Sequence, residues 1–154
     1  MDYHYNLGFS EKGYDYHILR NNYHMLGNSL HLSALYDFTP SLSIGAGIGS
    51  DRYEEPGYNT FPVFATVHYI PVKNHIPNAY LYTNLGYALK GEISRRGWLY
   101  DIGIGYKKMF RKHFGLNFQF GYNLKQFKIP YYYPVPKDRS SIRHSLSFGF
   151  GFIF

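Results

Sequence analysis

The chain has 154 residues, carries a formal net charge of +6 and contains no cysteine. Its length suits one domain, which we expect to cover residues 1–154, and the missing cysteine excludes disulfides and thiolate metal sites. No stretch approaches the roughly 18 consecutive apolar residues of a transmembrane helix, which excludes a helical membrane protein. A 21% share of aromatic residues, together with scattered glycine and proline, favours strands.

The basic residues are spread over segments that we expect to be turns and loops. The densest group, Lys107, Lys108, Arg111 and Lys112, falls in a single turn. A solvated turn that contacts anionic headgroups accounts for such a group better than a nucleic-acid site does. We therefore predict no nucleic-acid partner.

Five segments in the first ninety residues place apolar side chains at alternate positions, the pattern of a strand with one apolar face. Residues 3–10, 30–36 and 41–50 show it clearly, with small or polar residues between the apolar ones. Residues 61–69 and 79–88 carry apolar groups on both faces, so their register stays open, because a slip of one residue would exchange the faces. In the first strand we expect an inner face of His4, Asn6, Gly8 and Ser10.

Three segments in the C-terminal third repeat the alternation more strongly. Residues 98–107, 114–124 and 142–154 carry large apolar groups at most even positions and mainly glycine or polar residues at odd ones. An eight-stranded barrel has an interior only just wide enough for side chains, so we predict that the large groups face outward, toward lipid. In the last strand they form a ladder of Phe148, Phe150, Phe152 and Phe154.

The connections between these segments differ in length. Tight turns fall at residues 37–40 and 107–113, whereas longer polar links follow Ser10 and cover residues 51–60, 90–97 and 128–140. Outer-membrane barrels have short periplasmic turns and longer extracellular loops. The pattern predicts an all-β fold, an eight-stranded antiparallel up-and-down transmembrane β-barrel with both termini on the periplasmic side.

The expected location is the bacterial outer membrane, which a protein reaches with a signal peptide. Residues 1–4 show neither the basic region nor the apolar run of such a signal. We therefore interpret Met1 as an introduced start residue or as an edited mature terminus.

The ending from Ser145 to Phe154 has a terminal phenylalanine and aromatic residues at alternate preceding positions. It resembles the C-terminal assembly signal of outer-membrane barrel proteins. Residues 36–49 and 85–88 are similar to small outer-membrane β-barrel families of the OmpA and OmpX kind, especially those of Bacteroidota, and the resemblance covers nearly the whole chain. It implies that the barrel-assembly machinery reads the phenylalanine ladder, and it implies an architecture without any particular activity.

Three charged residues fall on the inner face of the clearest strands: Asp101, Lys107 and Arg143. A charge inside a narrow barrel needs a partner. We predict a lumen charge network in which Asp101 pairs with Arg143 as a structural plug, not as a conduction path.

The loop at residues 128–137 is rich in tyrosine and proline. Proline reduces the entropy that a loop loses on binding, and tyrosine is favoured at recognition surfaces. Tyr131, Tyr132 and Tyr133 are therefore candidates for contacting a partner, although packing of the loop over the barrel mouth explains the pattern equally well.

Metal and catalytic sites find little support in the sequence. The eight histidines are scattered, so we predict no metal and no cofactor. His31 and Ser33 have the spacing of the histidine–serine pair of lipid A deacylases, but our register points them into the lumen. His144 and Ser145 are adjacent and must face opposite sides, so neither pair completes a triad of base, nucleophile and acid.

These observations favour a non-enzymatic integral outer-membrane protein with a side-chain-filled lumen, acting as an accessory or interaction subunit of an outer-membrane complex. Its partners would be outer-membrane lipids, the barrel-assembly machinery during biogenesis, and another outer-membrane protein. Three alternatives stay open. A lipid A-modifying enzyme would carry histidine, serine and an acid on its outer face, a narrow pore would conduct ions, and a soluble ligand-binding barrel would turn the phenylalanine ladder inward.

Overall fold

The computed structural model describes residues 1–14, 16–21, 23–55, 57–71, 76, 78–91, 94–111, 114–129 and 139–154. None of the described residues belongs to a helix long and apolar enough to cross a membrane. The described strands are β1 (Asp2–Lys12), β2 (His17–Leu19), β3 (Leu26–Thr39), β4 (Leu42–Tyr53), β5 (Tyr58–Tyr69), β6 (Ala79–Leu89), β7 (Gly97–Arg111), β8 (Phe114–Ile129) and β9 (Arg139–Ile153).

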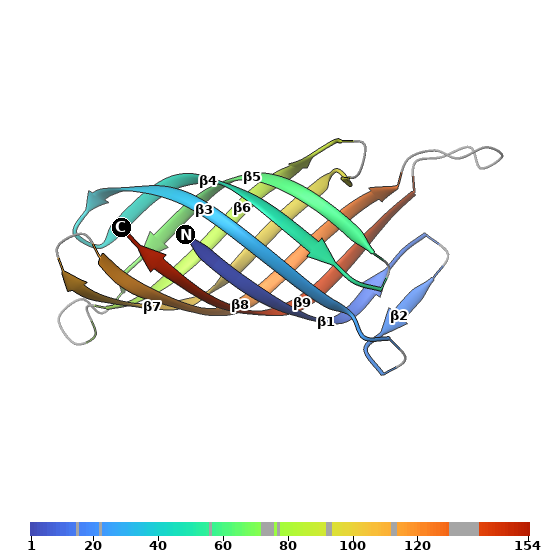
Figure 1. Ribbon diagram of the computed structural model, residues 1–154, viewed down its shortest axis with the longest axis horizontal. Coiled ribbons are helices and arrows are strands. Elements are labelled where there is room, and N and C mark those ends of the chain that lie inside the picture. Colours follow the sequence, from blue (N-terminus) through green and yellow to red (C-terminus); the bar gives the residue numbers. More distant parts are fainter. Residues whose placement is uncertain are drawn as a thin grey trace.

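Eight of these strands form a closed wall. From β3 to β9 each strand pairs antiparallel with the next, β1 pairs with β3, and β9 pairs back to β1, which closes the ring (Figure 1). The short strand β2 pairs with the end of β1 and extends that hairpin beyond the wall. The predicted all-β, antiparallel up-and-down barrel is confirmed, and β2 is an addition to the eight expected strands.

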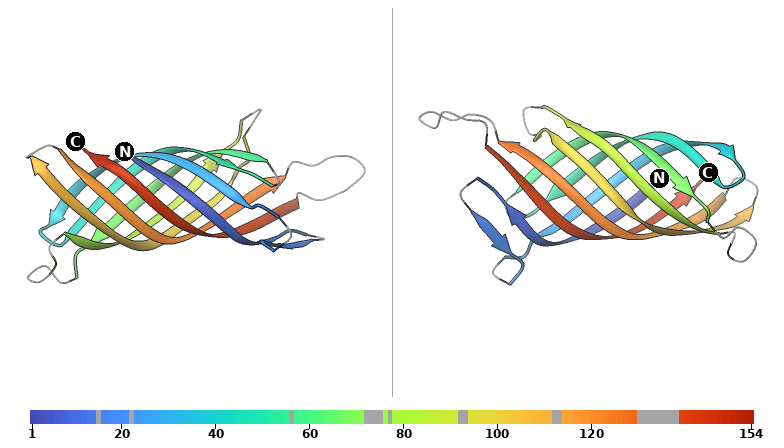
Figure 2. Two further views of the ribbon diagram at one scale, coloured as in Figure 1. Left: turned by 60° about the horizontal axis from the view of Figure 1, so that its bottom comes forward. Right: turned by 180° about the vertical axis from the view of Figure 1, so that it is seen from behind.

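The two ends of the barrel differ. Both chain termini lie at one end, and β2 lies at the other, as the two views of Figure 2 show. At the end with the termini, only two residues separate β3 from β4, and the backbone N–H of Leu42 donates to Thr39 Oγ1 at 3.0 Å. At the β2 end, the expected long link at residues 51–60 is wrong, because β4 continues to Tyr53 and β5 begins at Tyr58.

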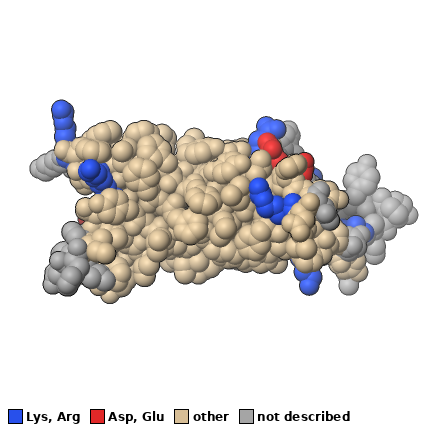
Figure 3. Space-filling view, turned by 90° about the horizontal axis from the view of Figure 1, so that it is seen from below, with Lys and Arg blue, Asp and Glu red and all other residues tan. Residues whose placement is uncertain are grey.

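The outer face is apolar around the middle of the barrel. Figure 3 shows Lys, Arg, Asp and Glu near the two ends of the molecule and other residues between them. The even-numbered apolar residues of the last three strands point outward, with Ile104 at 58% exposure and Phe148 at 45%. This polarity is that of a transmembrane barrel, since a soluble barrel would gather these groups inside.

The structure also fixes the register of the two strands that the sequence leaves open. In β5 the side chains of Phe64 and Thr66 are buried inside, and in β6 those of Tyr80 and Tyr82 are buried inside. Glycines on the next strand make room for these rings: a Cβ atom added at Gly105 would lie 2.2 Å from Cζ of Tyr80. The inner glycines are therefore packing partners of large rings.

One expectation for the inner face is wrong, and a β-bulge is the reason. The pairing of β1 with β9 shifts after Gly8, so that Ser10 pairs with His144 on the outer face and Glu11 pairs with Arg143 inside. The alternation of β1 therefore changes phase, and Glu11 becomes fully buried.

Candidate functional site

The lumen at the β2 end is closed by a buried arginine. Arg143 has no exposed surface, and its Nε donates to Glu11 Oε2 at 2.7 Å. Its Nη1 and Nη2 donate to the backbone oxygens of Glu54 and Glu55 at 2.9 and 2.8 Å. Its guanidinium also lies 5.6 Å from the ring centre of Tyr53. One side chain on β9 thus ties the closing seam of the barrel to the hairpin between β4 and β5.

A tyrosine outside the wall completes the surroundings of Glu11. Tyr16, between β1 and β2, donates its hydroxyl to Glu11 Oε1 at 2.8 Å. Burial raises the pKa of the Tyr16 hydroxyl above its ordinary value, so the phenol stays protonated and keeps donating. The carboxylate of Glu11 is therefore held by a cation on one oxygen and a hydroxyl on the other.

A second ion pair lies next to the first in the lumen. Lys125 Nζ approaches Asp51 Oδ2 at 2.7 Å, and neither side chain is exposed. The same carboxylate contacts His31 Nε2 at 2.9 Å and accepts a hydrogen bond from Thr60 Oγ1 at 2.8 Å. Because Lys125 and Arg143 are paired across β8 and β9, the two ion pairs form one continuous plug.

The predicted pairing of Asp101 with Arg143 is wrong. Asp101 accepts hydrogen bonds from Asn84 Nδ2 at 3.3 Å and from the side-chain amide of Asn123. Both residues are its direct register partners on β6 and β8, whereas Arg143 finds Glu11 in its own register on β1. These contacts follow from the strand register. The short carboxylate of Asp101 reaches the residues directly opposite it on the neighbouring strands more easily than a cation two strands away.

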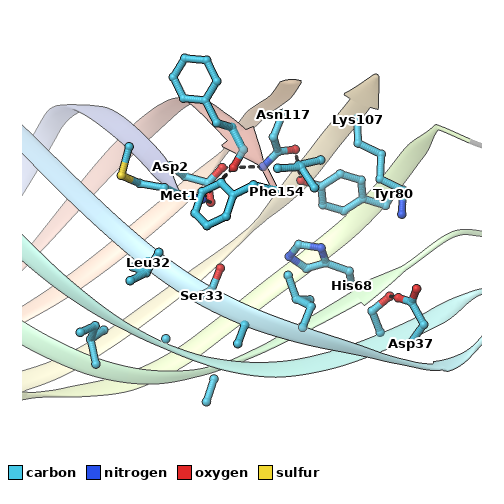
Figure 4. Close-up of a pocket in the computed structure, with 18 of the residues that line it drawn as sticks. Met1, Asp2, Leu32, Ser33, Asp37, His68, Tyr80, Lys107, Asn117 and Phe154 are labelled. Carbon is cyan, nitrogen blue, oxygen red and sulfur yellow. Dashed lines mark hydrogen bonds and ion pairs between the residues drawn. The ribbon is translucent and has the colours of Figure 1, made fainter. Parts of the chain in front are cut away.

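Other inner side chains lie beside a cavity at the end with the termini. This cavity has a volume of about 920 Å³, and Figure 4 shows Lys107, His68 and Tyr80 among its lining side chains. The rings of His68 and Tyr80 stack with centres 4.5 Å apart. Lys107 thus lines this cavity and pairs in register with Asn117, away from the Arg143 plug.

The histidine–serine pairs lie on the faces that the alternation predicts. His31 lies inside on Asp51, and His144 lies on the outer face against the hydroxyl of Tyr122, with Ser145 buried on the opposite face. A pair that the sequence did not reveal lies outside, where Ser10 Oγ contacts His17 Nε2 at 3.0 Å. The hairpin of β1 and β2 brings these two residues together.

The remaining predicted residues divide into two groups. Phe148, Phe150 and Phe152 lie on the outer face of β9, and Phe154 is exposed just beyond its end. Phe118 and Phe120 of β8 pair with Phe150 and Phe148. Tyr131, Tyr132 and Tyr133 lie outside the described residues. Within the described residues, no group of three or more histidine and acidic side chains is placed to hold a metal ion.

Sequence reasoning missed three members of the plug: Glu11, Asp51 and Lys125. For Asp51 and Lys125 the signal was present, because each continues the inner face of a strand that already alternates clearly. The expected strands end just before these two residues, at the first charged or polar run. Glu11 carried no such signal, because the bulge that turns it inward is set by pairing with β9.

The sequence matches no described protein family, and no curated protein shows significant similarity to it. Among solved structures, the chain is similar to a protein named KdgM porin, with 12% sequence identity and a TM-score of 0.40 over 99% of this chain and 97% of the porin. At this level of similarity the porin's activity says nothing about this chain.

Proposed function

We propose that the protein is an integral outer-membrane β-barrel with a closed lumen, which works without catalysis as an accessory or interaction subunit. The apolar exterior between two charged ends supports insertion in a membrane. An antiparallel barrel wall is the only β-structure that satisfies all backbone groups in lipid, and such barrels are typical of bacterial outer membranes.

The single observation that carries the closed lumen is the Arg143 plug. Its guanidinium and the adjacent Lys125–Asp51 pair occupy the lumen with fully buried, mutually bonded groups. Moving an ion through this layer would require breaking buried ion pairs, which is costly. A protein with this interior acts through its outer surface and its loops.

Planar-bilayer recording tests the closed lumen. We expect no reproducible conductance steps from the purified protein, because the plug spans the lumen at the β2 end. The double variant Arg143→Gly and Lys125→Gly removes both cations and their side-chain volume, and should conduct. Steady steps from the unaltered protein would refute the closed lumen and favour the narrow pore.

Copurification from native membranes in mild detergent tests the role as a subunit. The unaltered protein should retain a second outer-membrane protein at a fixed ratio. A triple variant, Tyr131→Ser, Tyr132→Ser and Tyr133→Ser, should no longer retain this partner. Its barrel should still be folded, as shown by a change of gel mobility on heating. Recovery of the barrel alone, or equal recovery of the partner with the variant, would contradict the proposal.

One observation favours a second function, hydrolysis of a lipid ester at the membrane surface. Ser10 and His17 form a nucleophile–base pair on the outer face. Serine would attack the ester carbonyl and pass its proton through His17 to the leaving alcohol, and water would then release the acid. No carboxylate contacts His17 in the part of the chain that the structure describes, which leaves the pair without an orienting acid.

A fluorophosphonate probe decides between the two functions. A working pair should be labelled at Ser10, and the label should disappear in Ser10→Ala and weaken in His17→Gln. Ser50, which is exposed on the outer face of β4, is the matched control, because Ser50→Ala should label normally. An unlabelled protein refutes ester hydrolysis by this pair.

A further inference from the structure

A row of polar side chains crosses the outer face near the β2 end of the barrel. Arg52 of β4 is exposed and stands in register with Asn28 of β3 and Asn59 of β5. In the part of the chain that the structure describes, Arg52 forms no ion pair: Asp51, next to it on β4, is buried inside, and Glu54, just beyond the strand, is exposed to solvent. The row therefore holds one unneutralised cation between two amides.

The hydrogen bonds within the row leave mainly donors free. The Tyr3 hydroxyl donates to Asn28 Oδ1 at 2.5 Å, so the acceptor oxygen of this amide is occupied and its NH2 group stays available. Arg52 adds a guanidinium with five N–H groups in a fixed plane. A guanidinium with amide donors beside it matches the oxygens of a phosphate, which guanidinium binds with charge-assisted hydrogen bonds.

An apolar surface lies directly below this row on the same three strands. Leu30, Ile48 and Phe61 are 49%, 59% and 42% exposed. Ser50, the small residue between Arg52 and Ile48, pairs with Leu30. The order along the barrel, cation and amides above apolar side chains, is the order of headgroup and acyl chains in a lipid leaflet.

We propose that Arg52, Asn28 and Asn59 bind the phosphate of a phosphorylated lipid in the outer leaflet, with its acyl chains against Leu30 and Phe61. This inference rests on the proposed function, because it requires the barrel to sit in the membrane with its β2 end outward. The attraction between the exposed Arg52 guanidinium and the negatively charged phosphate supplies the binding energy, because cations near a membrane surface attract anionic headgroups.

The opposite rim supplies a matched control. Lys108 of β7 is also exposed on the outer face, but its register partner on β8 is Leu116. It lies over the ring of Phe110 at 5.6 Å. Lys108 therefore has the same charge as Arg52 and is likewise exposed, but it has no amide side chain as a register partner among the described residues.

Native mass spectrometry of the detergent-solubilised protein tests the site with three probes: diphosphorylated lipid A, dephosphorylated lipid A, and inorganic phosphate. The unaltered protein should retain the diphosphorylated lipid in preference to the dephosphorylated one. Arg52→Gln should weaken retention roughly tenfold, the loss expected for one hydrogen bond to a charged group. Asn28→Asp should weaken it as well, because it replaces a donor with a negative charge, and Lys108→Gln should leave it unchanged.

Three results would overturn the site. Equal losses in Arg52→Gln and Lys108→Gln would show a general effect of charge, and equal retention of both lipids would show that phosphate is not recognised. Displacement of the lipid by millimolar inorganic phosphate at equal affinity would show a free-ion site. Insertion into lipid vesicles is measured in parallel: failure to insert refutes the membrane proposal, whereas insertion without phosphate-dependent retention refutes only this site.

Discussion

Replacing Arg143 by methionine should reveal how much the plug contributes to stability. Methionine has a similar length and fills the same part of the lumen, but it carries no charge and no hydrogen-bond donor. The change leaves Glu11 buried with only the Tyr16 hydroxyl on its carboxylate. It also removes the donors to the backbone oxygens of Glu54 and Glu55.

The expected loss follows from the burial of this pair. Both side chains are fully buried, and removing one partner of a buried ion pair costs about 3–5 kcal/mol, because the other charge stays uncompensated. For a domain of this length each kcal/mol shifts the melting temperature by about 2–4 °C, so a decrease of roughly 6–20 °C follows. Arg143→Lys keeps the charge with fewer donors and should lose less.

Heating in detergent, followed by the shift between folded and unfolded bands on gels, measures these melting temperatures. The double variant Glu11→Gln and Arg143→Met should recover part of the loss, because no buried charge is then left unpaired. A melting temperature for Arg143→Met within about 2 °C of the unaltered protein would refute this account, since it is smaller than the shift for 1 kcal/mol. A double variant that is less stable than Arg143→Met alone would also refute it.

Three further substitutions test the inner and outer faces. Phe148→Lys places a charge on the outer face and should cost roughly 2–4 kcal/mol near the membrane midplane, seen as reduced folding into vesicles; unchanged folding would argue against a lipid-facing ladder. Lys125→Met should lower the stability of the barrel in urea. The double variant Lys125→Met and Asp51→Asn should be more stable than this single variant, and a less stable double variant would mean that the pair does not act as a unit. Gly105→Val should lower the melting temperature, because the valine side chain overpacks against Tyr80. Adding Tyr80→Ala to this variant should relieve the clash. If the losses of the two single variants simply add in the double variant, that contact is disproved.

The faces of the clearly alternating strands were predictable from the sequence, because neighbouring residues in a regular strand point to opposite sides. The phenylalanine ladder of β9 and the inner position of Arg143 follow from this local rule, and both lie where it places them. The rule fails at Gly8, where a bulge changes the phase of β1. No single-strand pattern reveals a bulge that is set by the partner strand.

The contacts inside the barrel depended on closure of the ring. Glu11 and Arg143 are 132 positions apart in the chain, and they meet only because the first and last wall strands pair. Strand register places Asp101 beside two amides on its neighbouring strands, and closure of the ring gives Arg143 a carboxylate that no motif marked. Alternation therefore determined which side chains face inward, while the closed ring decided which of them bond, because it sets both the register partner of each residue and the residues that face it across the lumen, as Asp51 and Lys125 do.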